Sequence, residues 1–407
     1  IPLLFGQDVV HGYRTTFPIP LGETASWDMA LLDKSSRIAA IEASAAGIHW
    51  TFAPMIDIAR DPRWGRVMEG SGEDTYLGSK AAEARVKGFQ GKGLGNTDAV
   101  MACAKHFAAY GAAVGGRDYN SVDMSYRQLN ETYLPPFKSA VNAGVATLMN
   151  SFNDINGIPA TANSYILRDK LKGEWNFKGF VVSDWGSIGE MIPHGYAKDG
   201  SDAAMKAIIA GSDMDMESRC YRDNLKMLVE TGKVDVKYIN EAVRRILLVK
   251  YQMGLFEDPF RYCNEAREKA EENNPEHLAF AREIGAKSIV LLKNDAKGTA
   301  QKPVLPLKPS QNLALIGPFM KETTANHGFW SIAFDDDSQR IVTQFAGISA
   351  QAKGNVFYAK GCNIDDNDES GFAEAVATAL KADVVVMSLG EASDWSGEAK
   401  SRSNLHM

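Results

Sequence analysis

The sequence is most informative at Phe177-Lys-Gly-Phe-Val-Val-Ser-Asp-Trp185, where an apolar run leads directly into a carboxylic acid. The run Phe180–Val182, closely followed by Gly186, predicts a buried strand. A carboxylate beside an aromatic ring at the carboxyl end of a parallel barrel strand is typical of an active site. Asp184 could instead cap the helix that follows, because Asp is a favoured N-cap residue. Motifs elsewhere in the chain are needed to distinguish an active-site carboxylate from a helix cap.

The length and composition predict a globular protein of two domains. A chain of 407 residues exceeds one ordinary domain, and one of the two could be a barrel of about 250 residues. The hydrophobic content of 45% and charged content of 23% are ordinary values, which argues against general disorder. A net charge of −7 gives no reason to expect a nucleic-acid partner. No apolar run is long enough to span a bilayer, so we expect no membrane partner.

The ends of the chain and its cysteines add two expectations. The chain starts with the strand-like run Ile1–Gly6, without an initiator Met, and stops at Ser403–Met407 without a closing element. We therefore expect an excerpt of a longer protein, whose export cannot be judged from a signal sequence. The four cysteines are scattered without metal-ligand spacing, so we expect free thiols and no metal site.

Short apolar runs alternate with amphipathic segments from residue 1 to about 255, which predicts βαβ units and a parallel sheet. The expected strands are Pro2–Gly6, Trp50–Ile56, Val100–Phe107, Ala146–Ser151, Phe180–Ser183 and Ala210–Met214. The expected helices are Trp27–Ala46 with Ser26 as N-cap, Asp74–Gly91, Arg127–Asn142, Asn163–Trp175, Ala203–Ile209, Asp223–Glu230 and Asp235–Met253.

Polar residues follow nearly every expected strand. They are Asp8, Asp57, Arg60, Lys105, His106, Asn150, Asn153, Asp184, Asp213 and Asp215. Because parallel strands of a barrel end at the same face, this repetition predicts a polar rim there. Some of these residues are expected only to start turns or cap helices.

A second α/β region follows a break in the pattern. We expect a first domain over residues 1–255, a charge-rich linker over 256–285 and a second domain over 286–407. In the second domain, Ala382–Glu391 reads as a fully buried strand with Glu391 just past its end. An open sheet in a region of about 120 residues would normally continue, so this domain is expected to be truncated.

The chemistry available to this chain points to a carbohydrate. The sequence has no phosphate-binding glycine loop, no His-Glu-x-x-His and no nucleophile-elbow serine. Two strand-end carboxylates remain, Asp184 and Glu391. Tryptophans surround the motif stretches, at Trp27, Trp64, Trp185, Trp330 and Trp395. Cleaving a glycosidic bond requires two carboxyl groups in different roles, and flat apolar rings suit the C–H face of a sugar.

Several motifs resemble those of family 3 glycoside hydrolases, among which the bacterial periplasmic β-glucosidases are the most similar subgroup. The matching segments are Gly6–Gly12, Asp61–Arg66 with Glu69 and Glu73–Asp74, Lys105–Phe107, Phe177–Trp185, Lys287–Asn294 and Asn312–Pro318. The resemblance implies a (β/α)8-like TIM barrel followed by an α/β sandwich domain, and it implies no cofactor.

The resemblance also implies roles for individual residues. It assigns the nucleophile to Asp184 and sugar-hydroxyl binding to four residues, Asp8, Arg66, Lys105 and His106. Trp185 and Trp330 would form an aromatic clamp for the next sugar unit. Physical reasoning agrees with the polar roles, because a Lys and an Arg near Asp184 would keep its carboxylate ionised. The alternative to these binding roles is a structural one for each residue. Lys105 would form a structural salt bridge, His106 would be a core histidine, and Trp330 would pack in the core.

The expected activity is that of a retaining, exo-acting β-glucosidase on oligosaccharides or on aryl or alkyl β-glucosides. The alternatives are a β-xylosidase or arabinosidase of the same family, or a non-catalytic sugar-binding protein. The N-acetylglucosaminidase branch is set aside, because its catalytic His is absent from the residues after Phe107. The resemblance implies a periplasmic or secreted location, and a homodimer is a further expectation.

Two glutamates compete for the acid/base role. Glu391 ends an apolar strand, and a rigid strand fixes a carboxyl group better than a loop does. Glu398 lies in Ser396–Arg402, where Lys400 and Arg402 would favour its ionised form, the wrong direction for a general acid. We therefore expect Glu391 to be the acid/base residue and Glu398 to contact the sugar or anchor the loop.

Overall fold

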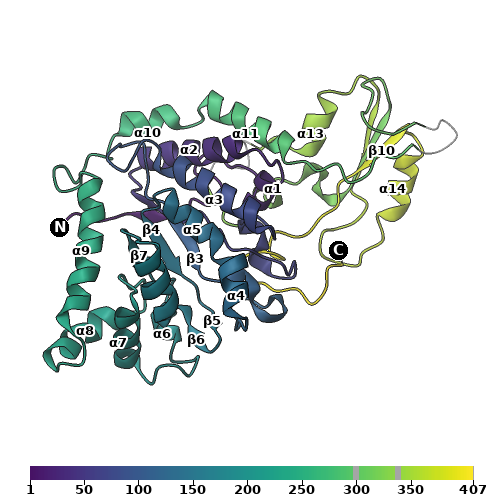
Figure 1. The fold of residues 1–407 in the computed structure, drawn as a ribbon. Helices are drawn as coiled ribbons and strands as arrows, with labels where there is room; N and C mark the ends of the chain where they lie inside the picture. The colour runs from purple at the N-terminus through teal and green to yellow at the C-terminus, as the bar shows by residue number, and fades with distance from the viewer. Residues whose placement is uncertain (297–301, 335–340, 407) are drawn as a thin grey trace. The chain divides into compact units, whose positions relative to one another are not determined.

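The chain divides into two compact units in the computed structural model, which describes residues 1–296, 302–334 and 341–406. The first unit comprises Ile1–Ser288, Trp330–Ile332 and Gly397–Asn404. The second comprises Ile289–Phe329, Ala333–Ser396 and Leu405–Met407. Both are built from helices and mainly parallel strands, so the predicted α/β class is confirmed (Figure 1).

The parallel strands of the first unit neighbour one another in chain order. The first pair joins β1 (Gly6–Gln7) to β2 (Trp50–Thr51), and Trp50 then bridges to Met101 just before β3. Next come β3 (Cys103–Phe107), β4 (Thr147–Asn150) and β7 (Phe180–Val182), after which Val182 bridges to Met214. This order is expected of consecutive right-handed βα units. It brings the carboxyl ends of these strands to one side.

The strands β3, β4 and β7 are buried along their whole length. Helices α2 (Met29–Ala45), α3 (Thr75–Gln90) and α5 (Pro135–Asn142) lie side by side next to them (Figure 1). A parallel strand covered on both faces needs apolar side chains on both, which explains the uninterrupted apolar run Phe180–Val182. Alanines line the buried faces of α2 and α3, which lets the two helices approach closely.

Most predicted helix positions match the structure, but one predicted helix cap and one predicted strand are corrected. The cap of α2 is Asp28, which accepts hydrogen bonds from the N–H groups of Ala30 and Leu31, and not Ser26. The strand predicted at Ala210–Met214 begins later, because α7 (Gly200–Ala210) continues through Ala210. A glycine in the left-handed region, Gly211 with φ of 113°, ends that helix, and Met214 alone forms the strand bridge.

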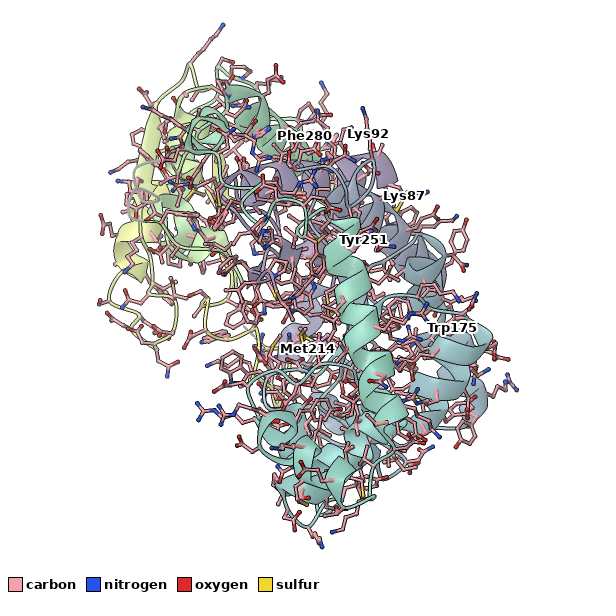
Figure 2. All side chains as sticks on the ribbon, turned by 90° about the vertical axis from the view of Figure 1, so that its left-hand side faces the viewer. Lys87, Lys92, Trp175, Met214, Tyr251 and Phe280 are labelled. Carbon is pink, nitrogen blue, oxygen red and sulfur yellow. The ribbon has the colours of Figure 1, made fainter. Side chains whose placement is uncertain are left out.

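The long helix α9 (Val236–Gln252) also belongs to the first unit, and Tyr251 near its end is labelled in Figure 2. Shorter helical elements of this unit include α1 (Pro20–Thr24), α4 (Tyr126–Gln128), the π-helical turns Leu129–Tyr133 and Tyr165–Glu174, α6 (Ser187–Glu190) and α8 (Cys220–Glu230). An antiparallel pair is formed by β5 (Asp154–Ile155) and β6 (Ile158–Pro159).

The segment predicted as a linker contains two helices of the first unit, α10 (Glu265–Glu271) and α11 (Pro275–Lys287). Phe280, labelled in Figure 2, and Ile284 are buried against Phe17, Leu31 and Ile38. His277, Phe280 and Ile284 form a buried stripe at helical spacing within a charge-rich sequence. The structure therefore corrects the linker prediction, although α10 buries no side chain, in line with its charged composition.

The second unit contains a parallel sheet in the order β10–β8–β9, with bounds Val384–Met387, Leu313–Ile316 and Val356–Ala359. Its longer helices are α13 (Gln344–Ser349) and α14 (Phe372–Ala379). The central β8 is buried, but Val385 and Met387 of β10 are 41% and 61% exposed. The prediction of a fully buried strand at Ala382–Glu391 is thus wrong, because β10 is an edge strand among the described residues. None of the described helices combines the length and hydropathy needed to cross a membrane.

Candidate active site

Asp184 lies just beyond β7, on backbone that is fixed by hydrogen bonds to neighbouring residues. The carboxylate of Asp213 accepts a hydrogen bond from the N–H of Val181 at 2.9 Å and is ion-paired with Lys172 at 2.7 Å. The N–H of Ser183 donates to the carbonyl of Met214 at 2.8 Å. These bonds fix the end of the strand, and therefore the position from which the Asp184 side chain leaves it.

The Asp184 carboxyl group does not cap a helix. Its Oδ1 accepts a hydrogen bond from the N–H of the adjacent Trp185 at 2.7 Å, and α6 begins after Gly186 without a side-chain cap. The Oδ2 atom is buried and has no hydrogen-bond partner among the residues that the structure describes. A buried carboxylate oxygen left open in this way is available to a reacting group.

A cavity of about 650 Å³ within the first unit is open to this carboxyl group. Its wall includes most of the predicted site residues, namely Asp8, Arg66, Lys105, Asp184, Trp185, Trp330 and Glu398. Apolar side chains complete the wall at Phe52, Met149, Phe152 and Met216. The cavity therefore combines charged groups with flat and apolar surfaces, a combination that suits a sugar ring.

Arg66 contacts three other side chains of the site. Its guanidinium is buried and binds both carboxylate oxygens of Glu69, at 2.7 and 3.0 Å. It also donates to Oε1 of Glu398 at 3.1 Å and contacts Nε2 of His106 at 2.9 Å. Burial opposes its charge, but Glu69 and Glu398 raise the pKa of Arg66 well above the usual value. Arg66 thus remains a fixed cation at the cavity wall.

His106 lies behind Arg66 and not on the cavity wall. Its Nδ1 is 2.9 Å from Oδ2 of Asp57, and its ring is fully buried. Burial, with Arg66 and Lys105 nearby, lowers the pKa of His106 well below the usual value. A neutral ring with its proton on Nδ1 donates to Asp57 and accepts from Arg66 through Nε2. Burial in turn raises the pKa of Asp57 to about 7.

Lys105 supplies the second cation. Its Nζ is 2.9 Å from Oδ1 of Asp8 and 5.3 Å from the ring centroid of Trp330. Burial opposes its charge, but Asp8 and Glu69 raise the pKa of Lys105, which keeps it protonated. At Asp184, by contrast, the effect of burial on the pKa outweighs that of the nearby charges. Burial raises the pKa of Asp184 to about 7, although the charges of Arg66 and Lys105 lower it.

The two acid/base candidates belong to different units. Glu398 is part of the first unit and lines the cavity, where its Oε1 accepts hydrogen bonds from Arg66 and from the hydroxyl of Tyr119 at 2.9 Å. Glu391 belongs to the second unit, just past β10. The structure thus brings Glu398 together with Asp184 in one cavity.

Sequence reasoning missed two polar residues of this cavity, Tyr119 and Glu190. Tyr119 follows β3 after a glycine-containing loop, and Glu190 ends α6, the helix directly after Asp184. Both lie on connections that leave the carboxyl ends of predicted strands. The prediction covered only the polar residues directly after each strand. Considering the whole connection that follows each strand would have included Tyr119 and Glu190.

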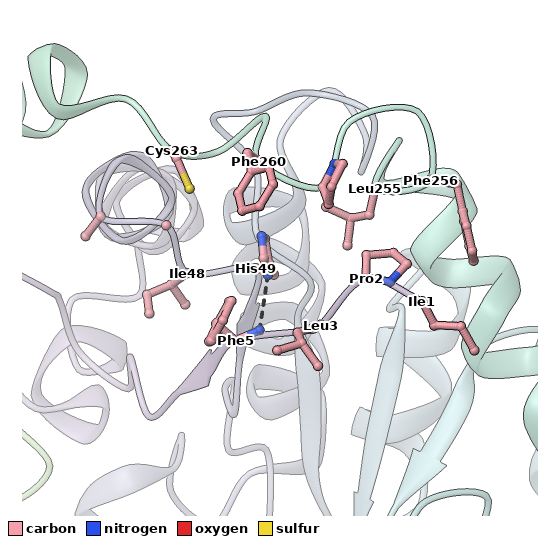
Figure 3. A pocket seen from close by; sticks show the side chains of 13 residues that line it. Ile1, Pro2, Leu3, Phe5, Ile48, His49, Leu255, Phe256, Phe260 and Cys263 are labelled. Carbon is pink, nitrogen blue, oxygen red and sulfur yellow. Dashed lines mark hydrogen bonds between the residues drawn. The ribbon is translucent and has the colours of Figure 1, made fainter.

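A second cavity, of about 910 Å³, has a different character. Figure 3 shows its mostly apolar wall, in which the N–H of Phe5 donates to Nδ1 of His49 at 3.1 Å. Its wall contains no carboxylic acid. Within the described part of the chain, no group of His, Cys, Asp and Glu side chains is arranged to hold a metal ion.

The chain matches two family models along most of its length. Residues 1–249 match the glycosyl hydrolase family 3 N-terminal domain, and residues 289–407 match the family 3 C-terminal domain. The chain belongs to glycosyl hydrolase family 3.

Known relatives agree with this membership. The chain is 42% identical to the periplasmic beta-glucosidase of Salmonella typhimurium, over 100% of this chain and 55% of the relative. It is 35% identical to a beta-xylosidase of Formosa agariphila, over 98% of this chain and 56% of the relative. A crystal structure of a Listeria innocua beta-glucosidase in complex with glucose has a TM-score of 0.92 and 40% identity, covering 99% of this chain and 54% of that one. The chain spans about half the length of these relatives.

Proposed function

We propose that this family 3 protein is a retaining, exo-acting β-glucosidase that removes terminal β-glucosyl residues. The observation that carries the proposal is the open Oδ2 of Asp184, in a cavity that also contains Glu398, two cations and two tryptophans. The chain-order succession of parallel strands supports a (β/α)8-like barrel in the first domain, followed by an α/β sandwich domain. The Salmonella relative supports a periplasmic or secreted location.

In this proposal Asp184 attacks the anomeric carbon and forms a covalent glycosyl-enzyme, while a second carboxyl group protonates the leaving oxygen. The same second group then removes a proton from the water that releases the sugar. We assign this role to Glu398, because it lines the same cavity as Asp184. Glu391 remains the alternative acid/base residue, because it lies just past the end of strand β10.

The other polar residues would bind the sugar itself. Lys105 and Asp8, paired at 2.9 Å, offer a donor and an acceptor to neighbouring hydroxyl groups. Arg66 adds a further donor, and His106 acts through Arg66. Trp185, which is 66% exposed, and Trp330 present the flat surfaces of the proposed clamp. Hydrogen bonds that strengthen as charge develops on the sugar would lower the activation barrier.

A β-xylosidase of the same family is the second candidate, favoured by the 35% identity to the Formosa agariphila beta-xylosidase. A xylosyl unit lacks the hydroxymethyl group of glucose, so the two activities differ in how the pocket accepts that group. The glucose complex of the Listeria innocua relative favours glucose at this site.

The proposal is tested by trapping and by substrate comparison. A 2-fluoro-glucoside with a good leaving group should inactivate the protein, and peptide mapping should place the label on Asp184. A matched panel of nitrophenyl glucoside, xyloside and arabinoside then separates the candidate activities. NMR of the first-formed sugar should show the β-anomer. Labelling of another residue, or initial release of the α-anomer, would contradict the mechanism.

A further inference from the structure

Asp118 connects segments that are far apart in the sequence. Its Oδ1 accepts a hydrogen bond from Nε1 of Trp64 at 2.8 Å, and its Oδ2 accepts one from the N–H of Ala399 at 2.7 Å. Its own N–H donates to Oγ of Ser401 at 2.8 Å. Asp118 is not part of the cavity wall. A single carboxylate thus joins the third connection of the first unit to the segment that carries Glu398.

The same segment is also bound by main-chain hydrogen bonds. The N–H of Gly397 donates to the carbonyl of Gly65 at 2.7 Å, and the N–H of Gly65 donates to the carbonyl of Lys400 at 3.0 Å. The N–H of Arg402 donates to the carbonyl of Arg63 at 2.9 Å. Trp64, the residue between these partners, is 1% exposed. Asp118 is therefore hydrogen-bonded to a buried side chain, whose two sequence neighbours bind the segment that carries Glu398.

The bond to Ala399 acts at a point of backbone strain. Ala399 has a φ of 59°, in the left-handed region that a residue other than glycine adopts only at a cost. It directly follows Glu398, so its conformation sets the direction in which the chain passes Glu398. A carboxylate that accepts its N–H favours this conformation through a charge-assisted hydrogen bond.

The neighbour of Asp118 holds the side chain of the same glutamate. Tyr119 donates its hydroxyl to Oε1 of Glu398 at 2.9 Å. The ring of Tyr119 packs edge-on against Phe152, with 4.9 Å between centroids. Asp118 and Tyr119 thus fix the backbone and the carboxyl group of Glu398 from one short stretch of chain.

We propose that Asp118 is a positioning residue that orients Glu398 for proton transfer, without touching the substrate. The inference rests on the proposed function, in which Glu398 is the acid/base residue. Proton transfer requires the carboxyl group at hydrogen-bond distance from the leaving oxygen, so a small rotation of the segment lowers its efficiency. Loss of Asp118 should then affect leaving-group protonation more than sugar binding.

The experiment compares Asp118→Ala and Asp118→Asn with Glu398→Ala in the full-length protein. Each variant is assayed on 2,4-dinitrophenyl glucoside, which needs no acid, and on phenyl glucoside, which does. Asp118→Ala should lower kcat/KM on phenyl glucoside about tenfold or more, since a general acid contributes about 10² to 10⁴ in rate. The loss on the dinitrophenyl substrate should stay within about threefold, and glucose inhibition should be unchanged.

Two further readouts separate positioning from a general structural defect. Asp118→Asn retains an acceptor oxygen and should lose less activity on phenyl glucoside than Asp118→Ala, and it supplies the measurement if the Ala variant does not fold. Asp123→Asn is the matched control, because Asp123 is exposed and its side chain has no hydrogen bond or ion pair among the described residues. It should behave as wild type.

The outcomes are distinguishable. If Glu398→Ala discriminates between the two leaving groups and Asp118→Ala does not, the positioning role is wrong while the proposed function stands. Equal losses of Asp118→Ala on both substrates, or weaker glucose inhibition, would also overturn the role. If Glu398→Ala itself shows no discrimination, the acid/base assignment fails, and the inference about Asp118 fails with it.

Discussion

The Nε2 atom of His106 lies 3.6 Å from Oδ2 of Asp184, beyond hydrogen-bond distance. Because burial keeps the His106 ring neutral, this nitrogen adds no positive charge to help Asp184 ionise. The ionisation of Asp184 therefore depends on two more distant cations, Arg66 and Lys105, which act against burial. The result is a carboxyl group whose pKa lies near 7.

This value predicts the acidic side of the pH–rate profile. A nucleophilic carboxylate must be ionised, so kcat/KM should fall as the pH drops through about 7, the pKa of Asp184 in the free protein. Measuring kcat/KM for a nitrophenyl glucoside across the neutral range gives the apparent pKa. Lys105→Ala removes one cation and should move that limb to higher pH. An acidic limb near pH 4, the range of an ordinary aspartate, would show that burial does not raise the pKa of Asp184.

The same shift predicts a stability change in Asp184→Asn. Because the folded-state pKa is raised from 3.8 to about 7, the folded protein binds this proton more tightly than the unfolded chain does. The stability gained from the proton is fully present below pH 3.8 and is lost as the pH rises through about 7. Asn, which cannot ionise, should therefore stabilise the protein at alkaline pH by up to about 4 kcal/mol.

Thermal unfolding at about pH 5 and about pH 8 measures this difference. The Tm of Asp184→Asn should exceed that of wild type more at the higher pH than at the lower. Asp123→Asn, which removes an exposed carboxylate, serves as the control and should leave the Tm nearly unchanged at both. An Asn variant that is less stable than wild type at about pH 8 would show that Asp184 is not destabilised by burial.

The position of Asp184 could be predicted from sequence because its signal is local. An apolar run ended by polar residues identifies β7 and its carboxyl end, and helix caps such as Asp74 and Asp235 fix the bounds of α3 and α9. Burial was harder to predict, because it depends on partners elsewhere in the chain. The run at β10 resembles a central strand, yet it lies at a sheet edge, and α11 packs although its surroundings are charged.

The arrangement around Glu398 could not be predicted in this way. Tyr119 and Glu398 are separated by 279 positions, and Asp118 and Ala399 by 281, so no local pattern relates them. Position at a strand end favoured Glu391, because that rule considers how firmly a side chain is held by its own element. A loop can also be fixed by other loops, as the hydrogen bonds between this segment and Arg63, Gly65 and Asp118 illustrate.

Lys105 is expected to act on turnover more than on binding. Its Nζ is paired with Asp8 and lies over the face of Trp330, at the wall where a sugar hydroxyl would be bound. Hydrogen bonds to the sugar strengthen in the transition state, so Lys105→Ala should lower kcat by about tenfold or more while glucose inhibition changes less. The exposed Lys92→Ala is the charge-matched control, and Lys92 is labelled in Figure 2. Unchanged turnover in Lys105→Ala would remove this residue from the site.

The acid/base residue is the last assignment to test, with Glu398→Ala and Glu391→Ala as a matched pair. Glu398 lines the cavity of Asp184, so its removal should lower kcat/KM for phenyl glucoside by about 10² or more and leave kcat/KM for dinitrophenyl glucoside much less affected. Loss of the base also slows the release of the sugar from the glycosyl-enzyme, which lowers kcat for the dinitrophenyl substrate. In the vacated space, added azide should attack the glycosyl-enzyme, restore turnover and yield a β-glucosyl azide. Glu391→Ala should show neither leaving-group dependence nor azide rescue. The reverse pattern, with rescue only in Glu391→Ala, would return the role to the strand-end glutamate and leave Glu398 as a sugar contact.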